Sequence, residues 1–284
     1  MKQEQLVWIL SGLFGRATVN LNNRPLVEHA HRQLNILFKM GGADATFRVG
    51  GEDLLLDDGS VLLFNSWLPH AKLPSTGNPT LILSLFIEPA WLARVQPGTA
   101  TKMEQLFPAP RATLGEEVRM HANRLAAAIP THIRSPDDQC EALLLNLVDA
   151  LVTHHADSSV NREVLPRHRT IDFRIRKALA YIHDNALRNP RMDEVAGAVG
   201  MSRSRFFEQF RNCVGISPQH YTDYVRMTAA TRRLSTSDVP LIELADEFGF
   251  SGHSNFTRFF IQHIGVSPSE FRRQTAEGAP GPDA

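Results

Sequence analysis

Three histidines in the first part of the chain, His29, His31 and His70, are candidates for binding a ligand. Alternation along a β-strand would place His29 and His31 on the same face of the strand. Together with His70 they would supply three imidazoles, a set that suits zinc, iron or nickel. The sequence therefore predicts a binding site whose side chains come from strands.

The segments around these histidines have the pattern of an antiparallel β domain. Residues 6–88 alternate short apolar runs with turn residues, as at Gly50-Gly51 and Asp57-Asp58-Gly59. Turn signals at such close spacing are typical of all-β domains. We expect a barrel or a sandwich over this range.

An amphipathic helix is predicted over residues 137–155. Its apolar side chains recur at helical spacing and are Leu143, Leu144, Leu147, Leu151 and Val152. Two explanations of this apolar face stay open: it packs on its own domain, or it forms the seam of a dimer. Residues 161–169 have the composition of an exposed linker, so we place the domain boundary there.

The part after the linker is helical and contains an internal repeat. The spacing i, i+3, i+4, i+7 of a short helix with one buried face occurs twice, 49 positions apart, at Met192, Val195, Ala196 and Val199 and at Leu241, Leu244, Ala245 and Phe248. Each run is followed by a glycine, Gly200 or Gly249, where a tight turn between helices needs positive φ.

The match between the two copies continues beyond these glycines. Ser202 can cap the next helix of the first copy, and the turn of the second copy is one residue longer. The matching pairs that follow are Phe206 and Phe256, Phe210 and Phe260, Gly215 and Gly265, Pro218 and Pro268, and Tyr221 and Phe271. Two copies of a helix, a glycine turn and a second helix predict two helix-turn-helix units, whose second helices enter the DNA major groove.

This repeat resembles the DNA-binding domain of the AraC/XylS family of bacterial transcription regulators. The strings that carry the resemblance are Ala196-x3-Gly200-Met201-Ser202-x3-Phe206-x3-Phe210, Gly215-x-Ser217-Pro218-x2-Tyr221-x4-Arg226 and Ala245-x3-Gly249-Phe250-x3-Ser254-x-Phe256-x3-Phe260-x4-Gly265-x-Ser267-Pro268-x2-Phe271-Arg272. The resemblance implies two units joined by a long helix over about residues 219–235. It also implies an activator that is a homodimer and contacts RNA polymerase.

The resemblance further implies which residues contact DNA. The base-reading positions are Arg203, Ser204, Phe207 and Glu208 in the first recognition helix, and Gly252, His253, Ser254, Asn255 and Arg258 in the second. The candidates for phosphate contacts are Arg203, Arg205, Arg211, Arg272 and Arg273. Arg258 suits guanine and Asn255 suits adenine. Glu208 stands where the family often has a basic residue, so the first helix either reads a cytosine or contributes less specificity.

The first half resembles the cupin barrel, on the spacing of His29-Ala30-His31, Gly42, Gly59 and His70. Metal-binding cupins use such histidines together with a glutamate, but Asn35 occupies the glutamate position here. Asn65 and Trp67 likewise replace a proline and a glycine of the pattern. We therefore expect a metal-free effector domain without a cofactor, with His29, His31 and His70 binding the effector.

Charge and composition narrow the class of protein. The chain has no net formal charge, but residues 169–273 carry 15 Lys and Arg against 11 Asp and Glu, which points to this half as the one that meets DNA. The longest apolar run, residues 6–10, is far shorter than the roughly 20 residues of a membrane span. Cys140 and Cys213 have no metal-site spacing. We expect a cytoplasmic protein with no membrane partner.

The complete prediction is an α+β multidomain regulator of transcription, not an enzyme, that binds double-stranded DNA and a small-molecule effector. The expected divisions are a cupin-like barrel over 1–92, a helical dimerisation or linker region over 93–160, the linker 161–169, the DNA-binding domain 170–273 and a disordered tail over 274–284. The alternative is a metal-dependent cupin enzyme that uses His29, His31 and His70, with the helical domain as an accessory.

Overall fold

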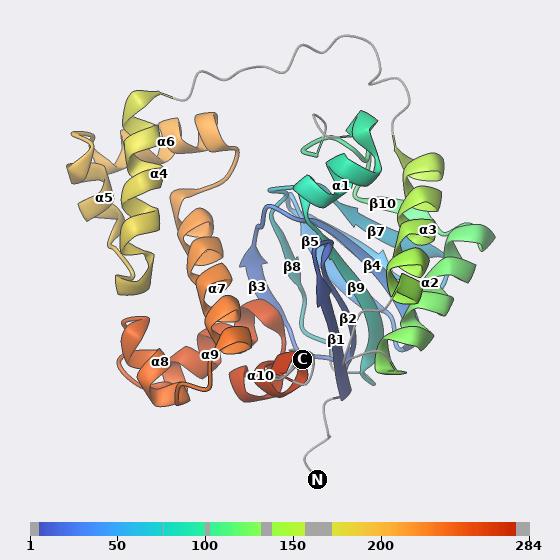
Figure 1. Cartoon of the computed structure of the whole chain (residues 1–284). Helices are drawn as coiled ribbons and strands as arrows, with labels where there is room; N and C mark the ends of the chain where they lie inside the picture. Colours follow the sequence, from blue (N-terminus) through green and yellow to red (C-terminus); the bar gives the residue numbers. More distant parts are fainter. Residues whose placement is uncertain (1–5, 76, 100–102, 132–137, 157–171, 277–284) are drawn as a thin grey trace.

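The computed structural model describes residues 6–75, 77–99, 103–131, 138–156 and 172–276. A β-rich part and a helical part lie side by side, and the long helix α7 runs between them (Figure 1). The predicted linker 161–169 lies outside the described residues. No helix in the described ranges combines the length and the apolar character that a membrane crossing requires.

Within the described residues, ten strands form two antiparallel sheets. The order is β1-β2-β9-β4-β7-β10 in the larger sheet and β3-β8-β5-β6 in the smaller one. The strands are β1 (Leu6–Gly12), β2 (Gly15–Asn22), β3 (Leu26–His29), β4 (Leu34–Gly42), β5 (Ala45–Val49), β6 (Glu52–Leu56), β7 (Ser60–Phe64), β8 (His70–Lys72), β9 (Thr80–Ile87) and β10 (Arg111–Thr113). The prediction of an antiparallel β domain over residues 6–88 is confirmed.

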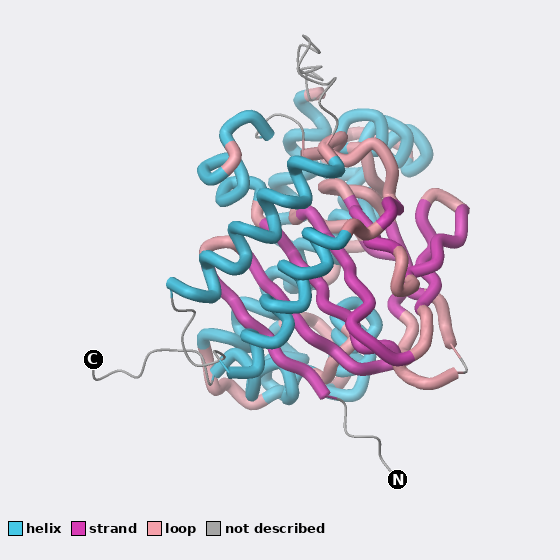
Figure 2. The backbone as a smooth tube through the Cα atoms, turned by 90° about the vertical axis from the view of Figure 1, so that its right-hand side faces the viewer, coloured by secondary structure: helices cyan, strands magenta, loops and turns pink. Residues whose placement is uncertain are grey.

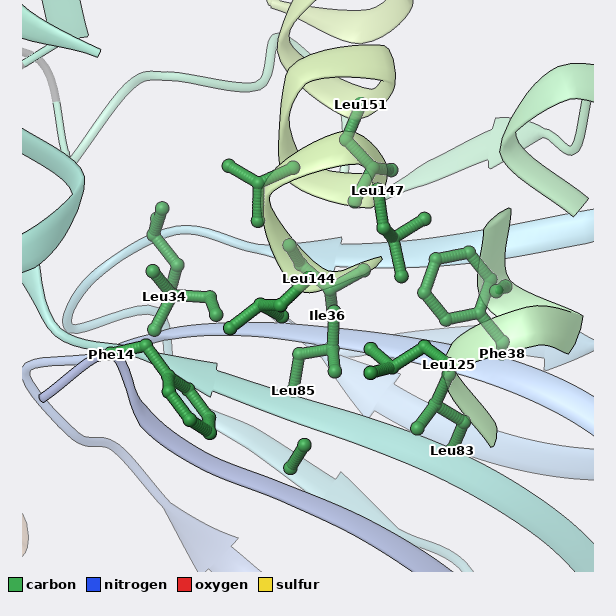
Figure 3. Close-up of a cluster of buried hydrophobic side chains, with 14 of the residues drawn as sticks. Phe14, Leu34, Ile36, Phe38, Leu83, Leu85, Leu125, Leu144, Leu147 and Leu151 are labelled. Carbon is green, nitrogen blue, oxygen red and sulfur yellow. The ribbon is translucent and has the colours of Figure 1, made fainter. Parts of the chain in front are cut away.

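The larger sheet is covered on one face by helices α2 (Glu116–Ala128) and α3 (Asp138–His155), which follow the short helix α1 (Pro89–Val95). Figure 2 shows these helices lying across the strands. Alternate residues of β4 and β9 point to them, and Figure 3 shows the resulting cluster, which includes Leu34, Ile36, Phe38, Leu83, Leu85, Leu125, Leu144, Leu147 and Leu151. The apolar face of α3 is therefore buried within its own domain, which favours the first of its two explanations.

The other face of the larger sheet looks toward the smaller sheet. Leu37 and Ile82 from the larger sheet share a second cluster with Phe47 and Leu56 from the smaller one. Each fully buried side chain of this size contributes roughly 1.5–3 kcal/mol to stability relative to an exposed one. The inward residues of β4 and β9 thus hold the two sheets together.

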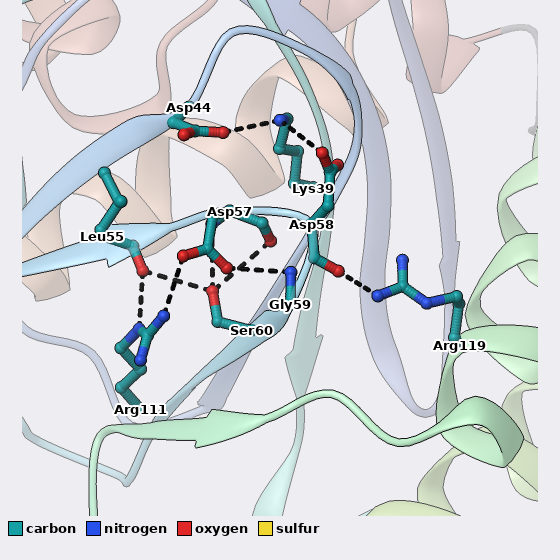
Figure 4. Close-up of polar contacts among 9 residues, drawn as sticks. All are labelled: Lys39, Asp44, Leu55, Asp57, Asp58, Gly59, Ser60, Arg111 and Arg119. Carbon is teal, nitrogen blue, oxygen red and sulfur yellow. Dashed lines mark hydrogen bonds and ion pairs between the residues drawn. The ribbon is translucent and has the colours of Figure 1, made fainter.

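The predicted turn at Asp57-Asp58-Gly59 joins β6 to β7 and is held by its side chains (Figure 4). Asp57 Oδ1 accepts a hydrogen bond from Gly59 N at 2.9 Å, and Arg111 Nη2 donates to Asp57 Oδ2 at 2.9 Å. Lys39 Nζ lies 3.2 Å from Asp58 Oδ2. Arg111 thus ties β10 to the turn and Lys39 ties β4 to it, so ion pairs stabilise this end of the sheets.

The helical part contains the two predicted helix-turn-helix units. Its helices are α4 (Phe173–Asn185), α5 (Met192–Ala198), α6 (Arg203–Val214), α7 (Pro218–Thr236), α8 (Leu241–Glu247), α9 (His253–Ile264) and α10 (Pro268–Ala276). The units are α5 with α6 and α8 with α9, and α7 joins them. Gly200 has φ +66° and Gly249 has φ +67°, as the predicted turns require.

One predicted boundary is wrong. We expected a disordered tail from residue 274, but α10 continues to Ala276 and Gln274 is buried. The reason is local: Gln274 Nε2 donates to Glu270 Oε1 one turn earlier, and Phe271 beside it packs into the apolar core of the second unit. The residues after 276 lie outside the described part of the chain.

Candidate functional site

The first recognition helix, α6, exposes its N-terminal turn. Arg203, Ser204 and Glu208 are exposed and Phe207 is half-buried. Ser202 caps the helix as predicted, accepting from Arg205 N at 3.4 Å. Arg203 is already engaged, because its Nη1 donates to Asp193 Oδ1 at 2.8 Å and its guanidinium lies 5.1 Å from the Phe207 ring centre. DNA would have to compete with Asp193 for Arg203.

The second recognition helix, α9, presents a different arrangement. His253, Ser254 and Arg258 are exposed and Asn255 is half-buried. Arg258 Nη2 donates to Asn255 Oδ1, and Asn255 Nδ2 donates to Ser251 Oγ at 2.7 Å. The two side chains best suited to reading bases therefore lie together, with no carboxylate bound to either of them among the described residues.

The four remaining basic candidates divide by their contacts. Arg205 and Arg211 are exposed on α6. Arg273 Nη2 donates to Glu270 Oε1 at 2.7 Å, and half-buried Arg272 donates to Val239 O at 2.6 Å. The geometry leaves Arg205 and Arg211 more accessible to a phosphate than Arg272.

The second unit, unlike the first, is packed against the β-rich part. Val7 and Ile9 of β1 belong to the same buried cluster as Phe256 and Phe260 of α9 and Phe271 of α10. The cluster of the first unit contains only residues from α4, α5, α6 and α7 and their connections. The larger sheet thus uses the face of β1 to bind the second helix-turn-helix unit.

A cavity of about 480 Å³ lies between the two parts of the molecule, within the range of known ligand sites. The β-rich part contributes Arg16, His29, His31, Phe86 and Glu88 to its walls. The helical part contributes residues of α7, together with Phe271 and the last turn of α9, where His263 and Ile264 lie. One wall of the cavity is therefore the end of a recognition helix.

Arg16 is the unusual charge in this cavity. Its Nε is buried without a hydrogen-bond partner, and its guanidinium lies 4.3 Å from the Phe86 ring centre and 5.8 Å from that of Phe271. Among the described residues no carboxylate forms an ion pair with it, and Glu88 instead accepts from Gln33 Nε2 at 2.6 Å. Burial lowers the pKa of Arg16 to about 10, so it stays positively charged at neutral pH.

The structure brings the three predicted histidines together. The ring centres of His29 and His70 are 4.5 Å apart, those of His31 and His70 5.1 Å, and those of His29 and His31 5.8 Å. Burial lowers the pKa of His31 and of His70 to about 3, and that of His29 falls well below its usual value for the same reason. All three imidazoles are neutral at neutral pH.

Trp67 forms a second contact between the two parts. Its ring centre lies 5.8 Å from that of Tyr221 and 4.9 Å from that of Tyr224, both on α7. The φ angle of Trp67 is +64°, a left-handed conformation that is rare for a bulky residue. Its backbone N–H donates to His31 O at 2.8 Å. The cupin pattern has glycine at this position, and the positive φ gives the physical reason.

Comparison with known proteins identifies relatives of the helical part. Residues 195–274 match the family described as "Helix-turn-helix domain". The chain is 34% identical over 133 residues to the arabinose operon regulatory protein of Escherichia coli K12. The aligned residues make up 46% of this chain and 44% of that protein. It is 28% identical over 98 residues to the lactose operon transcription activator of Staphylococcus xylosus, 34% of this chain and 35% of that protein. The family match lies in the helix-turn-helix part of the chain, and together with these relatives it supports the resemblance to the AraC/XylS family.

The matched segments span less than half the length of each of these relatives. Over the whole chain, the fold is similar to that of ToxT from Vibrio cholerae, with a TM-score of 0.52, 13% identity and coverage of 95% of this chain and 98% of that one. This similarity concerns the fold alone. It agrees with the observed order of an antiparallel β part followed by two helix-turn-helix units.

Two residues of the candidate site were not singled out from the sequence. Arg226 was part of the AraC/XylS string but had no assigned role; it is buried, donates from Nη2 to Phe248 O at 2.9 Å and lies over the rings of Phe250 and Phe259. It therefore positions the second unit on α7. Nothing in the sequence distinguished Arg16 from other polar residues. Polar and apolar residues alternate in β2, and a polar residue in such a strand is ordinarily expected on a solvent-exposed face of the sheet.

Proposed function

We propose that this protein is a sequence-specific regulator of transcription that binds double-stranded DNA through α6 and α9 and responds to a small anionic effector in the cavity between its two parts. One observation carries this proposal. Helix α9 has the candidate base-reading residues in its first two turns, while His263 and Ile264 in its last turn line the cavity. A molecule in the cavity would touch the helix that reads DNA.

The anionic character of the effector rests on Arg16. Arg16 is half-buried, and its Nε is desolvated without a hydrogen-bond partner. Desolvation of an unpaired charge is costly, and a carboxylate or similar group in the cavity would pair with the guanidinium through charge-assisted hydrogen bonds. The apolar walls, Phe86, Ile264 and Phe271, favour an apolar body attached to that anionic group. A ToxT structure that shares this fold is described as bound to an unsaturated fatty acid, which is consistent with an effector of this class.

The response follows from where the effector sits. A ligand changes a conformational equilibrium only through a difference in its affinity for the two states. Here the walls come from both parts of the chain, so any change in how the second unit packs on β1 changes the effector's contacts. Effector binding and DNA binding are then coupled reciprocally.

The DNA part of the proposal is tested by fluorescence anisotropy with a labelled fragment from upstream of the protein's own gene. We expect binding that weakens steeply with salt and that Arg258→Ala reduces more on this fragment than on random DNA. Arg94→Ala, an exposed arginine on α1, is the control and should leave binding unchanged. Binding of random DNA and of the fragment with equal affinity by the native chain, with and without carboxylate ligands, would contradict the proposal.

The effector part is tested by thermal unfolding in the presence of straight-chain and aromatic carboxylates. A ligand that binds the folded state raises the unfolding temperature by mass action. We expect at least one carboxylate to stabilise the native chain and the effect to disappear in Arg16→Gln but not in Arg24→Gln, an exposed arginine in the turn after β2. Equal stabilisation of both variants would remove Arg16 from the site.

The remaining partners are proposals that follow from the family. We infer that the protein acts in the cytoplasm as a homodimer, assembled through the helix at residues 138–155, and that it activates transcription through contact with RNA polymerase. The apolar face of α3 is used within the domain, so a dimer would form through its other face, where Gln139, Asn146 and Asp149 are exposed. Sedimentation showing only monomer at high concentration would exclude the dimer.

A further inference from the structure

The cavity between the two parts of the molecule has charges of both signs on its walls. Its ionised side chains are Arg16 and Glu88 from the β-rich part, and Asp223 and Arg232 from α7. Arg232 is exposed, so water solvates it, and Glu88 accepts a hydrogen bond from Gln33 Nε2. Arg16 and Asp223 are half-buried, and among the described residues neither forms an ion pair. The cavity therefore holds a cation and a carboxylate that are both without a counter-charge.

Asp223 has little to replace the water that it loses. Gln219 Nε2 donates to its Oδ1 at 3.1 Å, and within the described ranges no group donates to its Oδ2. Burial raises the pKa of the Asp223 carboxyl, because a carboxylate is solvated less well in the wall of a cavity than in water. A cationic group in the cavity would restore the lost stabilisation of the carboxylate.

The basic groups near Asp223 do not provide that counter-charge. Burial lowers the pKa of His263, so its imidazole is neutral at neutral pH. His220 Nε2 lies 3.4 Å from Glu28 Oε1, on the side of the β-rich part. Arg226 follows Asp223 by one turn of α7, but its Nη2 donates to a backbone carbonyl instead. Each of these groups acts on Asp223 from a distance, and none forms an ion pair with it.

We propose that the effector is a zwitterion whose carboxylate pairs with Arg16, whose ammonium group pairs with Asp223, and whose two charges are separated by an apolar chain. This inference rests on the effector site proposed above and specifies which carboxylates fit it. Arg16 on β2 and Asp223 on α7 do not contact each other, so a ligand that satisfies both must carry its own charges apart. Phe86, Ile264 and Phe271 supply apolar wall for the chain.

Two charged ends give the effector a hold on both parts of the molecule. Its carboxylate is bound by the β-rich part and its ammonium group by the helix that joins the two helix-turn-helix units. A plain carboxylate lacks the second charge-assisted contact. The zwitterion therefore distinguishes more strongly between two arrangements of the parts, which is what a ligand needs in order to shift the equilibrium between them.

The test is isothermal titration calorimetry of the full chain with ω-aminopentanoate, ω-aminohexanoate and ω-aminooctanoate. Each is compared with the unsubstituted carboxylate of the same chain length. We expect at least one ω-amino acid to bind the native chain roughly 10-fold or more tightly than its counterpart, as a hydrogen bond between charged groups provides. In Asp223→Asn the preference should reverse, because an ammonium group without an anion is costly in a cavity. Asp184→Asn, which changes an exposed aspartate on α4, should keep the native preference.

The comparison of ligands on the native chain needs no variant, so it decides the matter even if Asp223→Asn fails to fold. The inference is overturned if the unsubstituted carboxylate binds as tightly as the ω-amino acid at every length, or if folded Asp223→Asn keeps the native preference. It is also overturned if Glu88→Gln abolishes the preference and Asp223→Asn does not.

Arg16→Gln separates this inference from the effector proposal on which it rests, because it should weaken the binding of both classes of ligand. Carboxylates that bind without any preference for an ammonium group would leave the effector site standing and remove only the zwitterion. Failure of both classes to bind the native chain would remove the zwitterion and the carboxylate effector together. Neither outcome bears on the DNA-binding test.

Discussion

The two helix-turn-helix units are nearly the same in sequence pattern and in local geometry, yet they have different neighbours. In both, the residue after the turn glycine closes the same hydrogen bond, Met201 N to Ala196 O at 3.0 Å and Phe250 N to Ala245 O at 2.9 Å. The first unit is completed by α4 and α7, whereas the second is completed by β1, α7 and α10. Local sequence determines the structure of each unit, and the segments packed against it determine whether the unit lies beside the cavity.

The sharpest test of this difference compares the two cores. Phe206→Ala and Phe256→Ala each remove a fully buried ring, and each should lower the free energy of unfolding by about 3–5 kcal/mol. Only Phe256 shares its cluster with Val7 and Ile9, so only Phe256→Ala should speed hydrogen exchange in β1. Mass spectrometry of exchanged peptides measures this, and equal exchange of β1 in both variants would mean that the units are not docked differently.

The two recognition helices should also differ in their effect on DNA. Arg258→Ala should cost about 1–3 kcal/mol of specific binding, because a bidentate contact to a base is lost. Arg203→Ala should cost less than half as much, since Arg203 is held by Asp193 in the free protein. Anisotropy titrations on a specific and on a scrambled fragment provide the comparison. A larger loss for Arg203→Ala would reverse the assignment of the dominant helix.

Trp67 tests the contact between the β-rich part and α7. Trp67→Gly removes two ring contacts, worth about 0.5–1.5 kcal/mol each, but relieves a strained φ that costs about 1–3 kcal/mol. We expect the free energy of unfolding to change by less than about 1 kcal/mol while hydrogen exchange at residues 218–224 becomes faster. Trp67→Phe keeps both the strain and a ring, and should leave that exchange nearly unchanged. A loss of stability well above this limit for Trp67→Gly would show that the strain is not relieved.

The smallest expected effect concerns Asp193. Asp193→Asn frees Arg203 and should raise DNA affinity about two-fold, as expected for an exposed ion pair. The matched control is Glu243→Gln on α8, which removes a charge from the second unit without releasing an arginine. Because the hydrogen bond from Arg203 lowers the pKa of Asp193, the pair persists down through mildly acidic pH and is lost only as pH falls through that lowered value. An equal gain in both variants would reflect charge alone.

Much of the fold was predictable because it depends on short-range patterns. The glycines that end α5 and α8, the serine that caps α6 and the buried faces of α6 and α9 are determined within a few residues of each other. The histidine pair His29 and His31 was found for the same reason, since alternation along a strand needs no knowledge of distant segments. His70 was added by the spacing of a family pattern.

The cavity was not predictable from such patterns. Arg16 and His263 lie far apart in the sequence, and neither segment shows that the other faces it. Val7 and Ile9 have the alternation of any half-buried strand, and only the folded chain shows that they pack into the core of the second unit and α10 rather than against the smaller sheet. An interface between two separately predictable parts depends on how their folded surfaces fit together, and a single sequence does not give that fit.

The dimensions of α9 have a mechanical consequence. With 12 residues at 1.5 Å per residue, the helix is about 18 Å long. Its C-terminal turn forms part of the cavity wall, and its N-terminal turns carry Asn255 and Arg258. A helix this short does not bend appreciably, so it would move as a rigid body. A ligand that shifted its C-terminal turn by an ångström would then shift its N-terminal turn by a comparable distance. Such a shift is enough to bring a base-reading side chain into or out of hydrogen-bonding range. Coupling between the cavity and the base-reading residues would then need no chain of intermediate residues, because one helix contacts both.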